Sequence, residues 1–375
     1  MKLKSLKSKI VVLGSEGYIG TALIQRLLID GYDVVGVDDL SKNRLAEEIG
    51  TVSVTTQLDI EVKHNFYKKI GSFRFHAANI TQDVYPILDS YNIDTIVNLA
   101  QQPSAPFSHL NLDKATYTMI NNSIGTLNIL LWLKNKDIHY IEIESLGTFQ
   151  PDINTKIPEN LFQFFIDGRQ SVPSIFPKRP GSLYHLSKVT NTYLCDMANR
   201  WWNQTITSIN QGIVYGLYTP EIEDTRIFSP LWVDEHFGTV VNRLCAQKII
   251  NHPLTIYGTG NQKRGFIALA DSINCLMLFI KNPPRSGDIQ FPNQKADIYS
   301  INEIASFIGS DVRHIKTPRK ENTEEYYYNP ETEILKKLGY QKTREIKDEI
   351  EYILSEIDYS LVEKNKSLFI PKTLW

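Results

Sequence analysis

Three glycines that directly follow a short β-branched run constrain this chain more than any other feature. Gly14, Gly17 and Gly20 come after the apolar run Ile10–Leu13, and the next residues, Thr21–Asp30, have the apolar spacing of a helix. In such a unit the first glycine makes a tight turn, the second lets a pyrophosphate approach the backbone, and the third lets helix and strand pack closely. The phosphates then lie at a helix N-terminus, where free N–H groups favour negative charge. The segment therefore predicts a dinucleotide-binding turn.

The first half of the chain alternates strand patterns with helix patterns. Amphipathic segments separate further apolar runs, which indicate buried strands at Val34–Val37, Thr95–Ala100, Ile138–Ile143 and Thr205–Ile209. The connection Ser41–Gly71 is unusually long and has helical spacing, so we expect an inserted helical excursion there. Alternating strands and helices imply a parallel sheet with helices on both faces. We predict an α/β fold: a Rossmann doubly wound parallel sheet with a smaller, mixed α/β C-terminal substrate domain.

The pattern loosens near Gly216, where short strands and helices mix and prolines gather. We expect residues 1–215 to form the dinucleotide-binding Rossmann domain, with a return from about 264–292. The remaining parts, 216–263 and 293–375, are expected to form the substrate-binding domain and a C-terminal tail.

Composition narrows the class of protein. The 375 residues carry a formal charge of −2, which gives no reason to expect nucleic acid or an anionic membrane as a partner. No apolar run approaches the roughly 20 residues that span a bilayer, and the run Ile10–Leu13 is too short for a signal peptide. The three cysteines are widely spaced and odd in number, which suits neither a disulfide scaffold nor a zinc site. We therefore expect a cytoplasmic protein without a metal ion.

A carboxylate follows the second predicted strand. Asp38 lies about twenty residues beyond the glycines, where an acidic side chain accepts both hydroxyls of an adenosine ribose and repels a 2′-phosphate. This position favours NAD over NADP, and it is also compatible with a helix N-cap. Asn79 and Ile80 follow the strand-like run Ser72–His76 and are candidates to cap the adenine, with a simple Asx turn as the alternative.

The clearest catalytic pattern places Tyr184 four residues before Lys188. Residues at this spacing share one face of a helix, so the ammonium can lower the pKa of the phenol. The phenolate can then take the proton of a sugar hydroxyl while a hydride leaves the same carbon for nicotinamide. Such a spacing is common by chance. Here it is supported by the glycine turn, by Asp38 and by a strand that ends at Glu144 and Ser145.

Together these motifs resemble the extended short-chain dehydrogenase/reductase family, whose NAD-dependent epimerases and dehydratases modify nucleotide sugars. Within that family the chain is most similar to the sulfoquinovose-synthase branch, and the similarity covers nearly its whole length. Besides the glycine turn and the Tyr–Lys pair, the matching segments are Ser104–Ser108, Asn121–Asn128, Asn210–Gly216, Phe237–Arg243, His252–Gly258, Glu325–Asn329 and Ile370–Trp375.

The resemblance implies roles for matching positions. Tyr184 is implied as the base for oxidation at C4, Lys188 as its partner, and Ser145 as the hydroxyl that bonds the sugar O4. The implied cofactor contacts are Gly14, Gly17, Tyr18, Ile19, Gly20, Asp38, Asn79, Ile80, Ala100, Asn122 and Lys188. The implied substrate contacts are Gln101, Ser104, Asn210, Gln211, Asn242, Arg243, Thr255, Tyr257, Arg264 and Arg319. Forked arginine donors suit a pyrophosphate, although each arginine is also compatible with a surface salt bridge.

Two sites depart from the branch. Where the branch carries a glutamate three residues after the catalytic hydroxyl, this chain has Thr148, and a threonine is no general base near neutral pH. Where the branch carries a glutamate and an arginine, this chain has Gln101 and Pro103, so a plausible cation for an anionic sulfur donor is lost. His185 remains as a candidate acid or base because its ordinary pKa lies near neutrality, unless it packs away from the site.

Three functions therefore stay open. The first is transient C4 oxidation of a UDP-hexose, UDP-glucose above all, followed by sulfite addition at C6 and reduction. The second is a UDP-hexose 4-epimerase or another nucleotide-sugar oxidoreductase or dehydratase, which the altered site favours. The third is a non-catalytic NAD-binding protein, which the presence of both Tyr184 and Lys188 disfavours. A homodimer through the Tyr–Lys helices is also expected, and its candidate contacts are Leu183, Leu186, Leu194, Trp201 and Trp202.

Overall fold

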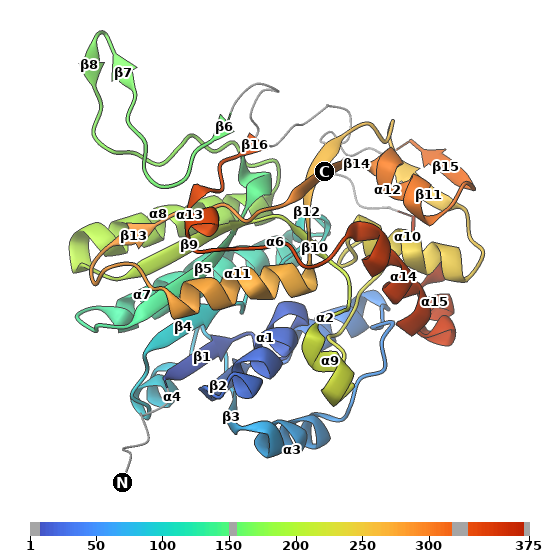
Figure 1. Ribbon diagram of the computed structural model, residues 1–375, viewed down its shortest axis with the longest axis horizontal. Helices are drawn as coiled ribbons and strands as arrows, with labels where there is room; N and C mark the ends of the chain where they lie inside the picture. Colours follow the sequence, from blue (N-terminus) through green and yellow to red (C-terminus); the bar gives the residue numbers. More distant parts are fainter. Residues whose placement is uncertain (1–7, 150–155, 317–328, 371–375) are drawn as a thin grey trace.

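A seven-stranded sheet in the order β13-β9-β5-β4-β1-β2-β3 forms the centre of the protein (Figure 1). The computed structural model describes residues 8–149, 156–316 and 329–370. The strands of the central sheet are β1 (Lys9–Leu13), β2 (Asp33–Asp38), β3 (Ser72–Ala77), β4 (Thr95–Asn98), β5 (His139–Ser145), β9 (Ile206–Gln211) and β13 (Ile289–Gln290). All neighbouring strands run parallel. The predicted Rossmann-like α/β fold is confirmed.

Helices cover both faces of this sheet, as Figure 1 shows. The principal ones are α1 (Tyr18–Ile29), α3 (Ile60–Ile70) and α11 (Leu269–Lys281) on one face, and α7 (Gly125–Leu133) and α8 (Leu183–Trp202) on the other. Successive side chains of a strand point to opposite faces. In β1, Ile10 and Val12 therefore enter the core with α1 and α11, whereas Val11 and Leu13 enter the core with α7 and α8.

A second group of elements follows β9 and has its own hydrophobic core. A three-stranded sheet consists of β10 (Ile213–Tyr215), β12 (Lys263–Ala268) and β14 (Asp297–Ser300), and a two-stranded sheet of β11 (Leu254–Tyr257) and β15 (Val312–Ile315). The helices around that core are α10 (Val240–Ile249), α12 (Ile301–Ile308), α14 (Ile346–Glu356) and α15 (Tyr359–Lys364). Within the expected return at 264–292, β12 joins the smaller sheet and β13 the central one. The domain boundaries themselves stay a prediction.

Two insertions extend this framework. Between β2 and β3 lie α2 (Ser41–Ile49) and α3, which form the predicted helical excursion. Lys63 and His64 of α3 both contact the carboxylate of Glu16, the latter at 3.0 Å, so the excursion is fixed to the glycine turn. Between β5 and α8, the hairpin of β7 (Phe165–Ile166) and β8 (Arg169–Gln170) projects from the body (Figure 1).

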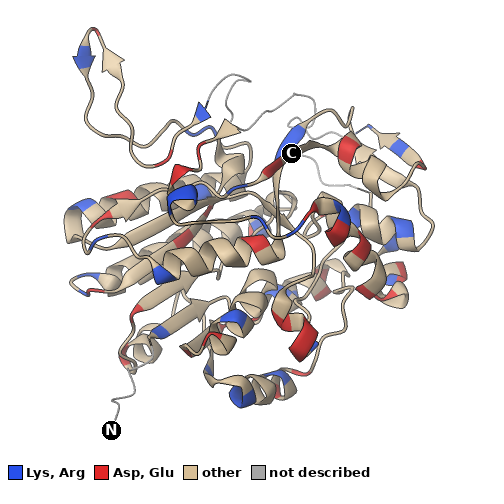
Figure 2. Cartoon of the chain, in the orientation of Figure 1, with Lys and Arg blue, Asp and Glu red and all other residues tan. Residues whose placement is uncertain are grey.

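Shorter elements complete the chain: α4 (Tyr85–Asp89), α5 (Ala105–Ser108), α6 (Leu112–Met119), η1 (Ile120–Ile124), η2 (Leu146–Thr148), β6 (Lys156–Ile157), α9 (Pro220–Thr225), β16 (Asn329–Pro330), α13 (Glu333–Lys337) and η4 (Lys366–Leu368). Basic and acidic residues are interspersed over the helices and loops (Figure 2). None of the helices in the described ranges is long and apolar enough to cross a bilayer.

Candidate active site

The turn after β1 and the first turn of α1 each have one position that accepts only glycine. Gly14 has a φ of +82°, and a Cβ there would lie 2.5 Å from the backbone carbon of Leu99. A Cβ at Gly20 would lie 2.1 Å from the carbonyl oxygen of Gly14, so this glycine lets α1 approach β1. Gly17 and Tyr18 lie at the start of α1, and Gly17 supplies no capping side chain. The free N–H groups of this helix end fit a pyrophosphate.

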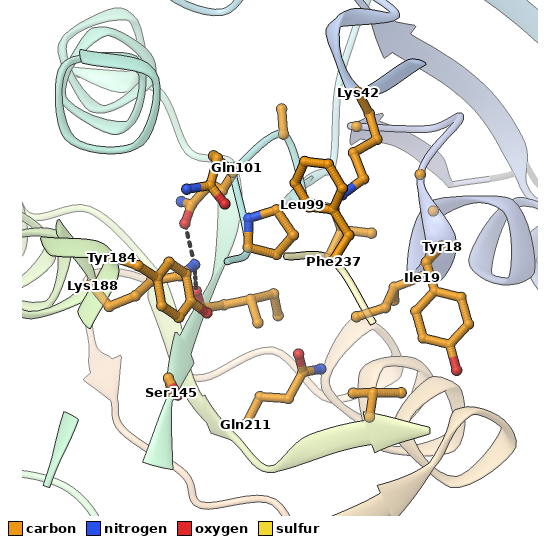
Figure 3. Close-up of a pocket in the computed structure, with 18 of the residues that line it drawn as sticks. Tyr18, Ile19, Lys42, Leu99, Gln101, Ser145, Tyr184, Lys188, Gln211 and Phe237 are labelled. Atoms are coloured by element: carbon orange, nitrogen blue, oxygen red, sulfur yellow. Dashed lines mark hydrogen bonds between the residues drawn. The ribbon is translucent and has the colours of Figure 1, made fainter. Parts of the chain in front are cut away.

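A cavity of about 460 Å³ opens beside this turn. In Figure 3, Tyr18 and Ile19 lie on one side of it and Tyr184, Lys188 and Ser145 on another. The predicted cofactor, catalytic and substrate residues that line it are Gly14, Gly17, Tyr18, Ile19, Gly20, Asp38, Asn79, Ile80, Ala100, Gln101, Ser145, Tyr184, His185, Lys188, Gln211, Asn242 and Arg264. Residues far apart in the sequence therefore meet at one site. Their individual roles stay predictions.

The end of β2 forms one part of the cavity wall. The carboxylate of Asp38 accepts hydrogen bonds from the backbone N–H groups of Glu16, at 2.9 Å, and Leu40, at 2.8 Å. Burial raises the pKa of Asp38 to about 6 although these two bonds oppose the rise. The group is therefore an acceptor at neutral pH. Asn79 makes the Asx turn given above as the alternative, because its Oδ1 accepts the N–H of Thr81 at 2.8 Å, and it still lines the cavity.

Helix α8 presents the Tyr–Lys pair to the cavity. It begins after Ser182, whose hydroxyl accepts the backbone N–H of His185 at 3.1 Å and so caps the helix. Tyr184 and Lys188 then follow one turn apart and both line the cavity. Because Tyr184 is the second residue after the N-cap, the position of the phenol depends on the first turn of this helix.

The contacts of the Tyr–Lys pair differ from the expectation that the lysine lowers the pKa of the phenol. Burial together with the nearby carboxylate of Glu144 raises the pKa of Tyr184. The ammonium of Lys188 donates to the side-chain oxygen of Gln101 (Figure 3) and, at 2.5 Å, to the carbonyl of Ile143. It lies 5.8 Å from the centre of the Tyr184 ring. In this structure the lysine is therefore engaged elsewhere.

His185 lines the cavity and does not pack away from it. Its Nδ1 lies 2.9 Å from the Ser182 hydroxyl, and a Cβ on Gly147 would lie 2.6 Å from its Nε2. Burial, assisted by the charge of Arg264, lowers the pKa of His185 to about 4. The expectation of a pKa near neutrality is therefore wrong for this structure. The imidazole is neutral at pH 7 and offers one N–H donor and one acceptor nitrogen.

Thr148 is buried and does not line the cavity. Its hydroxyl donates to the carbonyl oxygen of Ser145 at 2.8 Å. Thr148, which replaces the glutamate of the sulfoquinovose-synthase branch, thus closes the short turn η2 after β5. It presents no acid or base to a ligand.

Three predicted contacts lie behind the cavity wall. Asn122 accepts the N–H of Gln102 at 2.8 Å and donates to the Ser187 hydroxyl at 2.9 Å, which joins the loop after β4 to α8. Ser104 caps α5. It does not line the cavity, although its sequence neighbours Pro103 and Ala105 do. Asn210 donates to the side chain of Asn293 at 3.0 Å. These residues support the site through its framework.

The predicted arginine contacts are divided. Arg264 lines the cavity, whereas Arg243 is buried beside it, where its Nη2 donates to the carbonyl of Thr255 at 3.3 Å. The guanidinium of Arg243 lies 4.1 Å from the centre of the Tyr257 ring. Neither Thr255 nor Tyr257 lines the cavity. Arg319 lies outside the described residues.

Sequence reasoning missed an aromatic and cationic part of the wall. Lys42 of α2 lies 2.9 Å from the centre of the Phe237 ring (Figure 3) and 5.3 Å from that of Trp232. All three residues line the cavity. Burial lowers the pKa of Lys42. Lys42 lies only four residues after Asp38, and this closeness in the sequence could have indicated that it belongs to the same site. Among the described residues, no group of three His, Cys, Asp or Glu side chains is arranged to hold a metal ion.

Two relatives of this chain match most of its length. It is 35% identical to UDP-sulfoquinovose synthase from Sulfolobus acidocaldarius, over 98% of this chain and 97% of that protein. It is 31% identical to the chloroplastic UDP-sulfoquinovose synthase of Spinacia oleracea, over 89% of this chain and 72% of that protein. The predicted resemblance is therefore confirmed at the level of the sequence.

Solved structures share the fold at lower identity. UDP-glucose 4-epimerase from Thermotoga maritima, solved with UDP-glucose, has a TM-score of 0.68 and 16% identity, over 93% of this chain and 98% of its own. UDP-glucuronic acid 4-epimerase from Bacillus cereus, solved with UDP-glucuronic acid and NAD, has a TM-score of 0.65 and 19% identity, over 95% and 99%. The model of the NAD dependent epimerase/dehydratase family matches residues 10–290. The chain therefore belongs to the NAD dependent epimerase/dehydratase family.

Proposed function

We propose that this protein is an NAD-dependent enzyme that oxidises UDP-glucose transiently at C4 and converts it to UDP-sulfoquinovose. The observation that carries this proposal is the 35% identity to a UDP-sulfoquinovose synthase across nearly all of both chains. By contrast, UDP-glucuronic acid decarboxylase 1 of Danio rerio is 24% identical over 81% of this chain. Similarity that extends through both the cofactor half and the C-terminal half favours a shared substrate as well as a shared cofactor.

The proposed oxidation begins at the hydroxyl groups of Tyr184 and Ser145, two residues that line the cavity. Bound NAD supplies the hydride acceptor for C4. Ser145 orients the sugar O4, and Tyr184 takes its proton. Lys188 already makes polar contacts with Gln101 and a main-chain carbonyl, and we propose that it turns from these partners to the nicotinamide ribose and the phenol when the dinucleotide binds.

The later steps require a group that moves protons at C5 and C6. Thr148 cannot supply it, because its hydroxyl is bonded to a carbonyl behind the cavity wall. We assign this role to His185, which lines the cavity with its ring centre 5.0 Å from that of Tyr184. Since the imidazole is neutral at pH 7, it can accept the C5 proton and return one to the departing C6 oxygen. Sulfite would then add at C6, C5 would take up a proton, and return of the hydride to C4 would give UDP-sulfoquinovose and restore NAD.

The experiment is to incubate the purified, NAD-loaded protein with UDP-glucose, with and without sulfite, and to identify the nucleotide sugars by mass spectrometry. We expect a more acidic UDP-sugar that forms only in the presence of sulfite. A His185→Gln variant is expected to retain the C4 redox step, read as transient NADH absorbance, and to lose the sulfonated product. A UDP-glucose pool that stays unchanged with sulfite would refute the assignment.

A UDP-hexose 4-epimerase is the second candidate function. The observation that favours it is the absence of a carboxylate from the cavity at position 148, together with Gln101 and Pro103 in place of the branch's glutamate and arginine. Epimerisation needs only rotation of the 4-keto sugar and reduction from its other face. In the same experiment, UDP-galactose formed equally with and without sulfite, and no acidic product, would establish this alternative.

We also propose a homodimer in a reducing, cytoplasmic compartment. On η1 and α7, Ile120, Ile124 and Leu131 are 48%, 50% and 47% exposed. The adjacent α8 exposes Leu186 by 41% and Trp201 by 68%. Two neighbouring helices with apolar stripes suit a four-helix interface. Leu194 and Trp202, by contrast, pack against the sheet core. A reducing compartment fits the free, buried cysteines Cys195, Cys245 and Cys275.

The dimer is tested by light scattering after size-exclusion chromatography. We expect a mass of two chains for the unmodified protein and of one chain for an Ile124→Glu, Trp201→Glu double variant. Retention of the dimer by that variant would place the interface elsewhere.

A further inference from the structure

The carboxyl group of Glu144 is buried without a hydrogen-bond partner. Glu144 is 1% exposed, and neither of its oxygens has a partner in the part of the chain that the structure describes. Glu142, two residues earlier on the same face of β5, differs sharply, because it accepts hydrogen bonds from Asn98 at 2.9 Å and Asn191 at 3.2 Å. The strand therefore carries one satisfied buried acid and one unsatisfied buried acid.

Glu144 lies directly behind the predicted catalytic groups. It precedes Ser145, and Lys188 donates at 2.5 Å to the carbonyl of Ile143, the residue before it. Across the sheet, Glu144 pairs in register with Asn210, whose Oδ1 lies 3.4 Å from the ammonium of Lys178. Glu144 does not line the cavity. It can therefore act on a substrate only through the groups in front of it.

Several titratable groups face this carboxyl. They are Glu142 from β5, Tyr184, Lys188 and Cys195 from α8, and Lys178 from the segment before α8. Burial raises the pKa of Glu144 well above its usual range, against the attraction of Lys188. Burial also lowers the pKa of Lys178 to about 8. A carboxylate without donors is costly in such surroundings, so the acid form is favoured.

We propose that Glu144 is a positioning residue that holds a proton behind the active site, so that its acid form permits the phenolate of Tyr184 and its ionised form opposes it. The two groups share one low-dielectric region, and two negative charges there repel each other. This role rests on the proposed function only through Tyr184 as the base. Glu144 exchanges no proton with the sugar.

The test follows the phenolate absorbance of Tyr184 in the NAD-loaded protein, taken as the difference from a Tyr184→Phe variant, across a pH titration. Glutamine is neutral at every pH, so no carboxylate can form behind Tyr184 as the pH rises. In the Glu144→Gln background we therefore expect the midpoint of this titration to fall by on the order of one pH unit. The acid limb of the pH–rate profile should move in the same direction. Glu159→Gln is the matched control, since Glu159 accepts the backbone N–H of Ile334 at 2.9 Å outside the site, and it should leave the midpoint unchanged.

An unchanged midpoint in a folded Glu144→Gln protein overturns the proposal. If that variant does not fold, the wild-type titration decides: coupling to Glu144 requires a curve broader than one ionisation, and a curve that fits a single ionisation overturns it. The readout needs no sugar. A shifted midpoint in a protein that does not turn over UDP-glucose would therefore refute the proposed function and leave this inference intact.

Discussion

We predict that the affinity for NAD falls in acid, because the role proposed for Asp38, binding of the adenosine ribose, requires its carboxylate form. The pKa of Asp38 is about 6, against an ordinary value of 3.8, because the group is buried beside the glycine turn. Ribose hydroxyls donate hydrogen bonds and therefore need the ionised form as acceptor. In the dinucleotide-free protein, that form is lost as the pH falls through 6. We therefore expect binding to weaken over a range in which ordinary aspartates remain ionised.

The magnitude follows from the ionised fraction. With a pKa of about 6, roughly one tenth of the Asp38 side chains are ionised at pH 5, so the affinity falls about tenfold, or ~1.4 kcal/mol. The stability of the free protein changes in the opposite sense. Because the folded-state pKa is raised, protonation stabilises the fold as the pH falls from above 6 towards 4, by up to roughly 3 kcal/mol.

The assay is calorimetric titration of NAD into dinucleotide-free protein between pH 5 and 7.5. An Asp38→Asn variant should bind more weakly at pH 7.5 and lose the tenfold dependence, whereas the exposed Asp83→Asn control should retain both the affinity and its slope. A wild-type affinity that is constant over this range would refute the reasoning. So would an Asp38→Asn variant that keeps the wild-type slope.

Three further substitutions, and Gly50→Ala as a control for one of them, test the site and its framework. Tyr184→Phe should lower turnover by roughly two to four orders of magnitude and leave calorimetric NAD binding intact; unchanged turnover would exclude Tyr184 as the base. Gly20→Ala should abolish NAD binding, because its Cβ would lie 2.1 Å from the carbonyl oxygen of Gly14, whereas Gly50→Ala, with φ +77° and open space around it, should cost only about 1–2 kcal/mol in denaturant unfolding. Ser182→Ala removes the N-cap of α8 and should lower the free energy of unfolding by about 1 kcal/mol. It should also lower turnover, and a thermal midpoint equal to that of the wild type would contradict this prediction.

The central sheet could be predicted because each strand carries a local signal. The β-branched runs at Lys9–Leu13 and Val34–Val37 are too apolar for any exposed element, and glycines and helical spacings mark where each strand ends. The cavity residues on this sheet were predictable for the same reason. Asp38, Ser145 and the Tyr–Lys pair lie at strand ends or at one helical turn, so their neighbourhood follows from the topology.

Pairings and protonation states could not be predicted in this way. Lys263–Ala268 has the pattern of a strand, but only the packed structure places it beside β10, outside the central sheet. The partners of Lys188 belong to a loop and a strand that no spacing connects with it. The pKa of His185 falls because several distant segments bury it together. These properties depend on tertiary packing and are absent from any local pattern.

The contrast between a buried framework and variable side chains around the cavity explains how one fold can lead to different products. The groups that we propose for the first oxidation lie on β5 and α8, and their geometry is fixed by the buried sheet and its covering helix. The positions at which this chain departs from the sulfoquinovose-synthase branch, Gln101, Pro103 and Thr148, follow β4 and β5, and of these Gln101 and Pro103 line the cavity. Loop residues can change with little cost to the core. Exchange of a few such side chains can therefore redirect the intermediate, while the oxidation that produces it stays the same.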